Sequence, residues 1–108
     1  MAAKLDLVIR SERRAIFGTD VSAPDNWDII LILYLADAEG ERLTGRETIE
    51  RTGGCPEAGR RRIAHLSHSG MIAGDIHGSA DDVVTLAPAA ITKVERWLDH
   101  AWARIQST

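Results

Sequence analysis

The sequence predicts a mainly α-helical domain that carries one small β-hairpin. Apolar residues recur at helical spacing over most of the 108 residues. Between residues 71 and 86 this spacing gives way to two short apolar runs, separated by a segment rich in Gly, Ser and Asp, which is typical of a hairpin. The length allows one hydrophobic core. Hydrophobic residues make up 44% and charged residues 27%, which is the composition of a folded domain.

Two helices are expected in the first part of the chain. Residues 3–17 carry apolar residues at steps of three and four with Lys and Arg between them, and Gly18 ends the pattern. A helix-start signal with Ser22 as the cap precedes a second helix over about 24–39. This second helix is apolar on most sides, so we expect it at the centre of the core.

A pair of short helices joined by a glycine turn follows. Thr44 and Glu47 have the spacing of a capping box, in which the Thr hydroxyl and the Glu carboxylate each accept a backbone N–H. Glycines at 53–54 end this helix after about two turns. Proline then begins a second helix, over 56–69. Two short helices joined in this way form a helix-turn-helix unit.

The predicted hairpin and a long helix complete the chain. Strands are expected over 71–76 and 83–86, with a turn between them, and Pro88 begins a helix that runs to about Gln106. The expected organisation is an N-terminal helix and linker (1–22), a winged helix-turn-helix domain (23–88) and a C-terminal helix (89–108).

The net charge of −3 is unevenly distributed along the chain. Residues 23–43 contain five acids and one Arg, and residues 71–87 contain three Asp and no Lys or Arg. Residues 44–70 contain five Arg and two His against three Glu. Positive charge is therefore concentrated in the helix-turn-helix unit, where a nucleic-acid partner would bind.

A helical wheel divides the 56–69 helix into two faces. The buried seam is expected to consist of Gly59, Ile63, Leu66 and Gly70, with Arg62 beside it, packed or paired with a carboxylate of the scaffold. The opposite face carries Arg, His and Glu side chains. In a DNA major groove, Arg can donate two hydrogen bonds to guanine and Glu can accept one from cytosine. The alternative is an ordinary solvated helix face.

Residues 25–98 resemble the winged helix-turn-helix domain of MarR-type transcriptional regulators. The stretch 43–49 resembles the second helix of that family, 58–72 its recognition helix running into the first wing strand, and 83–88 its second wing strand entering the last helix. The resemblance implies sequence-specific binding of double-stranded DNA by a regulator of transcription, with the 56–69 helix in the major groove.

The expected DNA contacts combine this helix with the start of the preceding one. Thr44 and the amides that follow it would hold a backbone phosphate. The wing differs from the family, because Asp81 and Asp82 stand where such wings carry Arg or Lys, so we expect little affinity from it. The full set of expected contacts is Thr44, Arg46, Glu57, Arg60, Arg61, Ala64, His65 and His68.

The last helix predicts a homodimer. Its apolar residues follow the alternating three- and four-residue spacing of a helix that packs on another helix, and Trp97 and Trp102 flank this seam. The alternative is that the helix folds back on the N-terminal helix of its own chain. The expected interface is Leu5, Val8, Ile9, Ile91, Val94, Leu98, Ala101, Trp102 and Ile105.

Other functional classes are poorly supported. No catalytic constellation, phosphate loop or cofactor motif is present, and His65 and His68 lack the further ligands that a metal site needs. The single cysteine, Cys55, and the absence of an export signal favour the cytoplasm, and no apolar run is long enough for a membrane. We therefore expect no enzyme activity, cofactor, metal or membrane partner, and the sequence identifies no small-molecule effector. The alternative function is a winged-helix protein–protein interaction module that binds no DNA.

Overall fold

The structure is a computed structural model that describes residues 2–18, 23–74 and 81–106; the side chains of residues 2–6 and of Pro24 lie outside this description. The described part is mainly helical and includes one small antiparallel sheet, as the sequence predicts. In chain order the elements are α1 (Ala2–Phe17), α2 (Pro24–Ala38), β1 (Leu43–Thr44), α3 (Gly45–Thr52), α4 (Pro56–His68), β2 (Ile72–Ala73), β3 (Val83–Leu86) and α5 (Pro88–Gln106).

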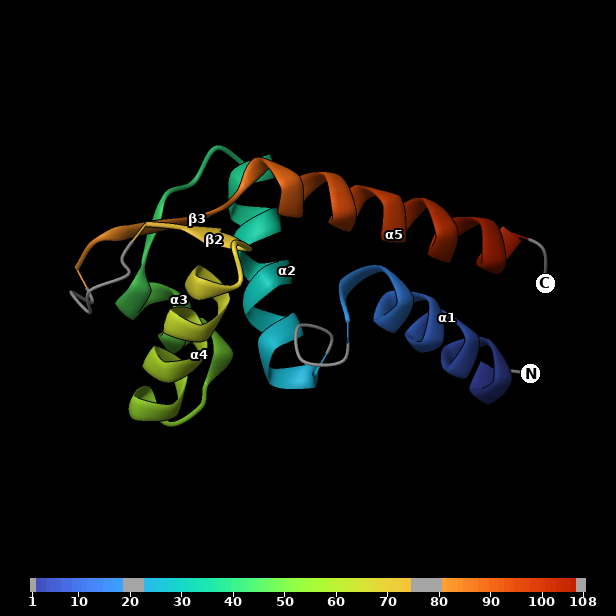
Figure 1. The fold of residues 1–108 in the computed structure, drawn as a ribbon, viewed down its shortest axis with the longest axis horizontal. Coiled ribbons are helices and arrows are strands. Elements are labelled where there is room, and N and C mark those ends of the chain that lie inside the picture. Colours follow the sequence, from blue (N-terminus) through green and yellow to red (C-terminus); the bar gives the residue numbers. More distant parts are fainter. Residues whose placement is uncertain (1, 19–22, 75–80, 107–108) are drawn as a thin grey trace.

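Helix α2 lies at the centre of the fold, between the α3–α4 pair on one side and α1 on the other (Figure 1). Its residues Ile29, Ile30 and Leu33 have at most 2% of their surface exposed, which confirms the central position predicted from its apolar composition. They pack with residues from the sheet, α4 and α5, including Leu43, Leu66, Val84 and Val94. Although α2 is apolar, no helix in the described part of the chain is long and apolar enough to cross a membrane.

The start of α2 differs from the prediction. Its N-cap is Ala23, which makes no side-chain capping bond, and Ser22, the expected cap, lies outside the described residues. The backbone carbonyl of Ala23 accepts the first helical hydrogen bond, from the N–H of Trp27 at 2.8 Å. Because proline has no N–H and its φ is already helical, a proline start costs little even without a side-chain cap.

The α3–α4 pair forms as expected. Gly53 ends α3 in the left-handed region at φ +75°, and Cys55 is the N-cap of α4. The helices approach so closely that a Cβ on Gly59 would lie 2.9 Å from both Ile49 Cγ1 and Cγ2. A glycine at position 59 therefore sets the distance between α3 and α4.

The sheet has three strands rather than the two of the predicted hairpin. β3 is central, with β1 and β2 antiparallel on either side; Leu43 pairs with Val84 and Ile72 with Leu86. β1 has only two residues and is held by this long-range pairing, so the local sequence pattern does not predict it. β2 is shorter than the strand expected over 71–76, and residues 75–80, which include the end of that strand and most of the expected turn, lie outside the described residues.

Helices α1 and α5 form an arm that extends away from the α3–α4 pair, with both chain ends at its far end (Figure 1). Trp97 lies inside this arm and does not flank an external seam as expected. Its indole N–H donates to the carbonyl of Ile9 at 3.3 Å, and its ring packs edge-on against Trp27 with centroids 4.9 Å apart. The Glu12 carboxylate accepts a hydrogen bond from Arg104 at 2.8 Å. The C-terminal helix therefore does pack on the N-terminal helix of its own chain.

Candidate nucleic-acid interface

Helix α4 is anchored by one narrow side. Gly59, Ile63 and Leu66 are buried as the helical wheel predicts, and Ser67 is buried beside them. Gly70 is exposed instead, because it lies beyond the helix in a turn with φ +78° that directs the chain toward β2. The orientation of α4 is thus fixed by α2 and α3, and its opposite side faces outward.

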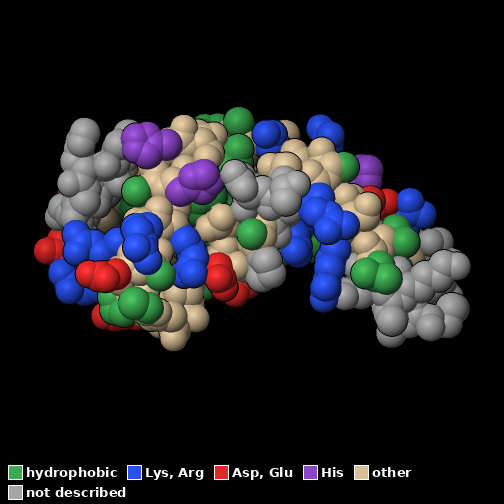
Figure 2. Space-filling model, turned by 60° about the horizontal axis from the view of Figure 1, so that its bottom comes forward, with side chains coloured by type: hydrophobic (Ala, Val, Ile, Leu, Met, Phe, Trp, Pro, Cys, Tyr) green, Lys and Arg blue, Asp and Glu red, His purple; other side chains and the backbone are tan. Residues whose placement is uncertain are grey.

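The outward side carries the basic residues. Figure 2 shows Arg and His side chains at the end of the molecule formed by α3 and α4, with Asp and Glu side chains among them. We call this surface the α4 face; Ala64 within it is half-buried and the other members are exposed. Its members are the residues predicted as DNA contacts on this helix: Glu57, Arg60, Arg61, Ala64, His65 and His68.

Arg62 has a different role from its neighbours, as its place beside the seam predicted. Its Nη2 donates to Asp25 Oδ2 at 3.1 Å, which joins α4 to the first turn of α2. Its side chain is 34% exposed and the Asp25 side chain is 69% exposed. The ion pair therefore links α4 to α2, and Arg62 is half-buried whereas Arg61 is exposed.

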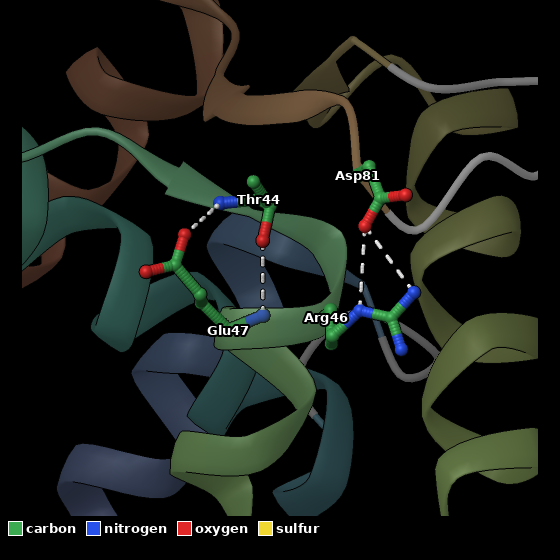
Figure 3. Close-up of polar contacts among 4 residues, drawn as sticks. All are labelled: Thr44, Arg46, Glu47 and Asp81. Atoms are coloured by element: carbon green, nitrogen blue, oxygen red, sulfur yellow. Dashed lines mark hydrogen bonds and ion pairs between the residues drawn. The ribbon is translucent and has the colours of Figure 1, made fainter.

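The start of α3 is more fully hydrogen-bonded than the sequence indicates. Thr44 Oγ1 accepts the N–H of Glu47 at 3.1 Å, and Glu47 Oε1 accepts the N–H of Thr44 at 3.0 Å (Figure 3), which confirms the capping box. The N–H of Gly45 donates to the carbonyl of Asp82 at 3.1 Å. Two of the amides expected to bind a phosphate are therefore occupied, and Arg46 is the group at this end that projects outward.

A hollow lies between α2 and α4. It has a volume of about 280 Å³ and opens broadly to the surface. Arg61 and His65 of the α4 face line it, together with Ala58, Arg62 and Asn26. Sequence reasoning did not select Asn26, because only the packing of α2 against α4 brings its amide to this surface.

Cys55 marks the start of α4 with a perturbed thiol. Its pKa is lowered, mainly because the sulfur lies near the backbone N–H groups of Ala58 and Glu57 and also because Arg61 and Arg62 are close. The thiol is exposed. These contacts reflect the positive end of the helix dipole and the positive charge of α4.

The predicted dimer residues fall into three groups. Val94 and Ala101 are buried within the chain, so a second copy would not touch them. Four others, Val8, Ile9, Ile91 and Leu98, are half-buried, and the side chain of Leu5 lies outside the described part. Trp102 and Ile105 remain 61% and 49% exposed, and Leu7, which the sequence did not single out, is 63% exposed. Among its described side chains, the arm thus keeps three large apolar ones at its surface.

The two surfaces differ in chemistry: the α4 face is charged, whereas the arm exposes apolar side chains. In the described part of the chain, no three His, Cys, Asp or Glu side chains are grouped so that they could hold a metal ion. The α4 face presents guanidinium and imidazole donors with one carboxylate acceptor, on a helix of fixed orientation. Comparison with models of protein families, with curated proteins and with solved structures gave no match for this chain.

Proposed function

We propose that the protein is a winged helix-turn-helix regulator of transcription that binds double-stranded DNA with α4 in the major groove. The observation that carries the proposal is the two-sided character of α4. Gly59, Ile63 and Leu66 are buried, while Arg60, Arg61 and His65 are exposed on the opposite side. A helix held by one thin seam can enter a groove without losing its contact with the scaffold.

The elements around α4 support the same function. The α3–α4 pair with its glycine turn has the form of a helix-turn-helix unit. β2 and β3 follow α4 directly and pair antiparallel, in the position of a wing of the MarR-like type. Arg61 and His65 would contact bases or phosphates, with Glu57 and His68 beside them.

The arm supports a homodimer as the DNA-binding form. Trp102, Ile105 and Leu7 are exposed on the two terminal helices, and large apolar side chains of this kind are typical of protein interfaces. A dimer with twofold symmetry would present two α4 helices to two half-sites of an operator. The two chains would contact each other through Leu98 and Trp102, while Val94 and Ala101 would remain buried within each chain.

One observation favours the second candidate, a protein–protein interaction module. Asp81 and Asp82 are exposed on the tip side of the wing, just before β3, where they would repel a phosphate backbone, and the net charge is −3. A protein partner would tolerate these carboxylates.

Titration of a fluorescent random-sequence duplex at increasing salt distinguishes the two functions. A phosphate-contacting regulator binds at low salt, and its affinity falls steeply as salt rises, with a logarithmic slope of about −0.9 for each phosphate contact. An oligomer that binds no duplex at low salt would favour the interaction module. Selection of bound fragments from random DNA then gives the operator.

A further inference from the structure

Arg46 and Asp81 connect the first turn of α3 to the tip side of the wing, just before β3 begins. Arg46 donates from Nε at 3.4 Å and from Nη2 at 3.2 Å, and both bonds go to the same oxygen, Oδ1 of Asp81 (Figure 3). The two residues are 35 positions apart in the chain. The Arg46 side chain is 60% exposed and that of Asp81 is 80% exposed. This pair therefore lies at the surface, next to the amides that begin α3.

The pair is looser than the other ion pair of α3. Arg51 donates to both oxygens of Glu41, at 2.9 and 2.8 Å, and both of these side chains are less than half exposed. Arg46 makes longer bonds to one oxygen only and is better hydrated. Exposed pairs of this kind are weak, since water and salt compete for both charges. The Arg46 guanidinium can therefore exchange its partner at little cost.

We propose that Asp81 is an internal substitute for a DNA phosphate, and that Arg46 exchanges this carboxylate for a backbone phosphate when the protein binds DNA. A guanidinium that donates two N–H groups to a carboxylate oxygen has the geometry that also fits a phosphate oxygen. The amides of Gly45 and Glu47 are already bound by the Asp82 carbonyl and the Thr44 hydroxyl, and the Arg46 side chain supplies the positive charge at this end of α3. The ligand class is a phosphodiester, and the inference rests on the proposed DNA-binding function.

The exchange gives the acidic wing a role. In the protein without DNA, Asp81 neutralises Arg46 and holds it near the wing. On DNA, the phosphate takes over Arg46, and the carboxylate of Asp81 is left close to the phosphate, which repels it. The free energy of DNA binding therefore includes an unfavourable contribution from Asp81 whenever a phosphate displaces it from Arg46. A duplex that lies on α4 without reaching Arg46 leaves the pair intact, so the cost falls only on complexes in which a phosphate reaches this arginine.

The test compares duplex affinity at low salt for wild type, Asp81→Asn and the matched control Asp82→Asn. Asp82 neighbours Asp81, carries the same charge, and its carboxylate has no ion pair within the described residues. Asp81→Asn should raise affinity about two- to fivefold, the range in which exposed ion pairs contribute, and more than Asp82→Asn does. Circular dichroism should show the same helix content in all three proteins.

A second background separates exchange from simple repulsion. Arg46→Ala should lower affinity, and adding Asp81→Asn to Arg46→Ala should then give no more gain than adding Asp82→Asn. Equal gains from the two Asn variants in the wild-type background, or an undiminished Asp81→Asn gain beside Arg46→Ala, would overturn the exchange alone. Lack of duplex binding by wild type and by every variant would overturn the proposed function and this inference with it.

Discussion

Gly59 of α4 lies directly against Ile49 of α3, at a distance that leaves no room for a side chain at position 59. A Cβ there would come within 2.9 Å of two carbons of the buried Ile49 side chain. This contact sets the spacing of the two helices that carry the candidate interface. The packing of α4 thus depends on the absence of a side chain at Gly59 as well as on the apolar side chains of Ile63 and Leu66.

Gly59→Ala is therefore expected to destabilise the protein. Overpacking costs about 1–3 kcal/mol, and the better helix propensity of alanine offsets about 1 kcal/mol of this, so the free energy of unfolding should fall by up to about 2 kcal/mol. Gly54→Ala is the matched control, because a Cβ at Gly54 meets nothing within 4 Å. Urea unfolding measures both variants. Equal stability of the two would show that α3 and α4 can separate without cost.

The ion pair between Glu41 and Arg51 predicts a dependence of stability on pH. The side-chain hydrogen bonds from Arg51 lower the pKa of Glu41. A carboxylate whose pKa is lower in the folded than in the unfolded state stabilises the fold at neutral pH, and this contribution disappears as pH falls below about 4.5 toward the folded-state value. Glu41→Gln should remove that part of the acid sensitivity.

The control for this measurement is Glu50→Gln. Glu50 lies on α3, is exposed like Glu41, and has no ion pair in the described part of the chain. Thermal unfolding should be measured at a series of pH values. As pH falls, the stability of Glu41→Gln should decrease less than that of wild type or Glu50→Gln. Identical curves for all three proteins would mean that the pair contributes nothing in solution.

Cys55 is expected to react as a thiolate at lower pH in the folded protein than in the unfolded chain. The N–H groups at the start of α4 and the nearby arginines stabilise the charged sulfur, so its pKa is lowered. Alkylation by iodoacetamide over a range of pH gives the midpoint, and the same protein in denaturant is the control, because the chain has a single cysteine. A folded midpoint at or above the unfolded one would contradict this.

Trp102→Glu is expected to dissociate the proposed dimer without unfolding the chain. Trp102 is 61% exposed, so the change leaves the core of one chain intact but puts a charge into the apolar contact of two arms. Sedimentation at micromolar concentrations should then show a monomer with native helix content. Thr92→Glu, at an exposed position near the start of α5, should remain dimeric. A monomeric wild-type protein would refute the dimer directly.

The parts of the fold that depend on neighbouring residues were predictable from the sequence. The Thr44–Glu47 capping box and the proline starts of α4 and α5 depend only on nearby residues. The helical wheel placed Arg62 correctly beside the seam, because the regular geometry of a helix determines which side each residue faces. A small side chain was also expected in the seam at Gly59, although the close approach to Ile49 was not.

The parts that depend on distant residues could not be predicted in this way. β1 exists only because Leu43 and Thr44 pair with β3, some forty residues later in the chain. Trp97 was assigned to an external surface because spacing alone does not reveal that α1 covers it. The pairing of Arg46 with Asp81 likewise links segments that only the complete fold brings together.

The affinity of Arg61→Ala for duplex DNA tests the central claim most directly. Arg61 is exposed on the α4 face and has no ion pair within the described residues, so its removal should change stability by no more than about 0.5 kcal/mol. Arg96→Ala on α5 removes the same charge from an exposed position away from this face. We expect Arg61→Ala to weaken binding by about 1–3 kcal/mol if the contact is to a base, while Arg96→Ala binds as wild type. Equal affinities of Arg61→Ala, Arg96→Ala and wild type would contradict the assignment of α4 as the DNA-binding helix.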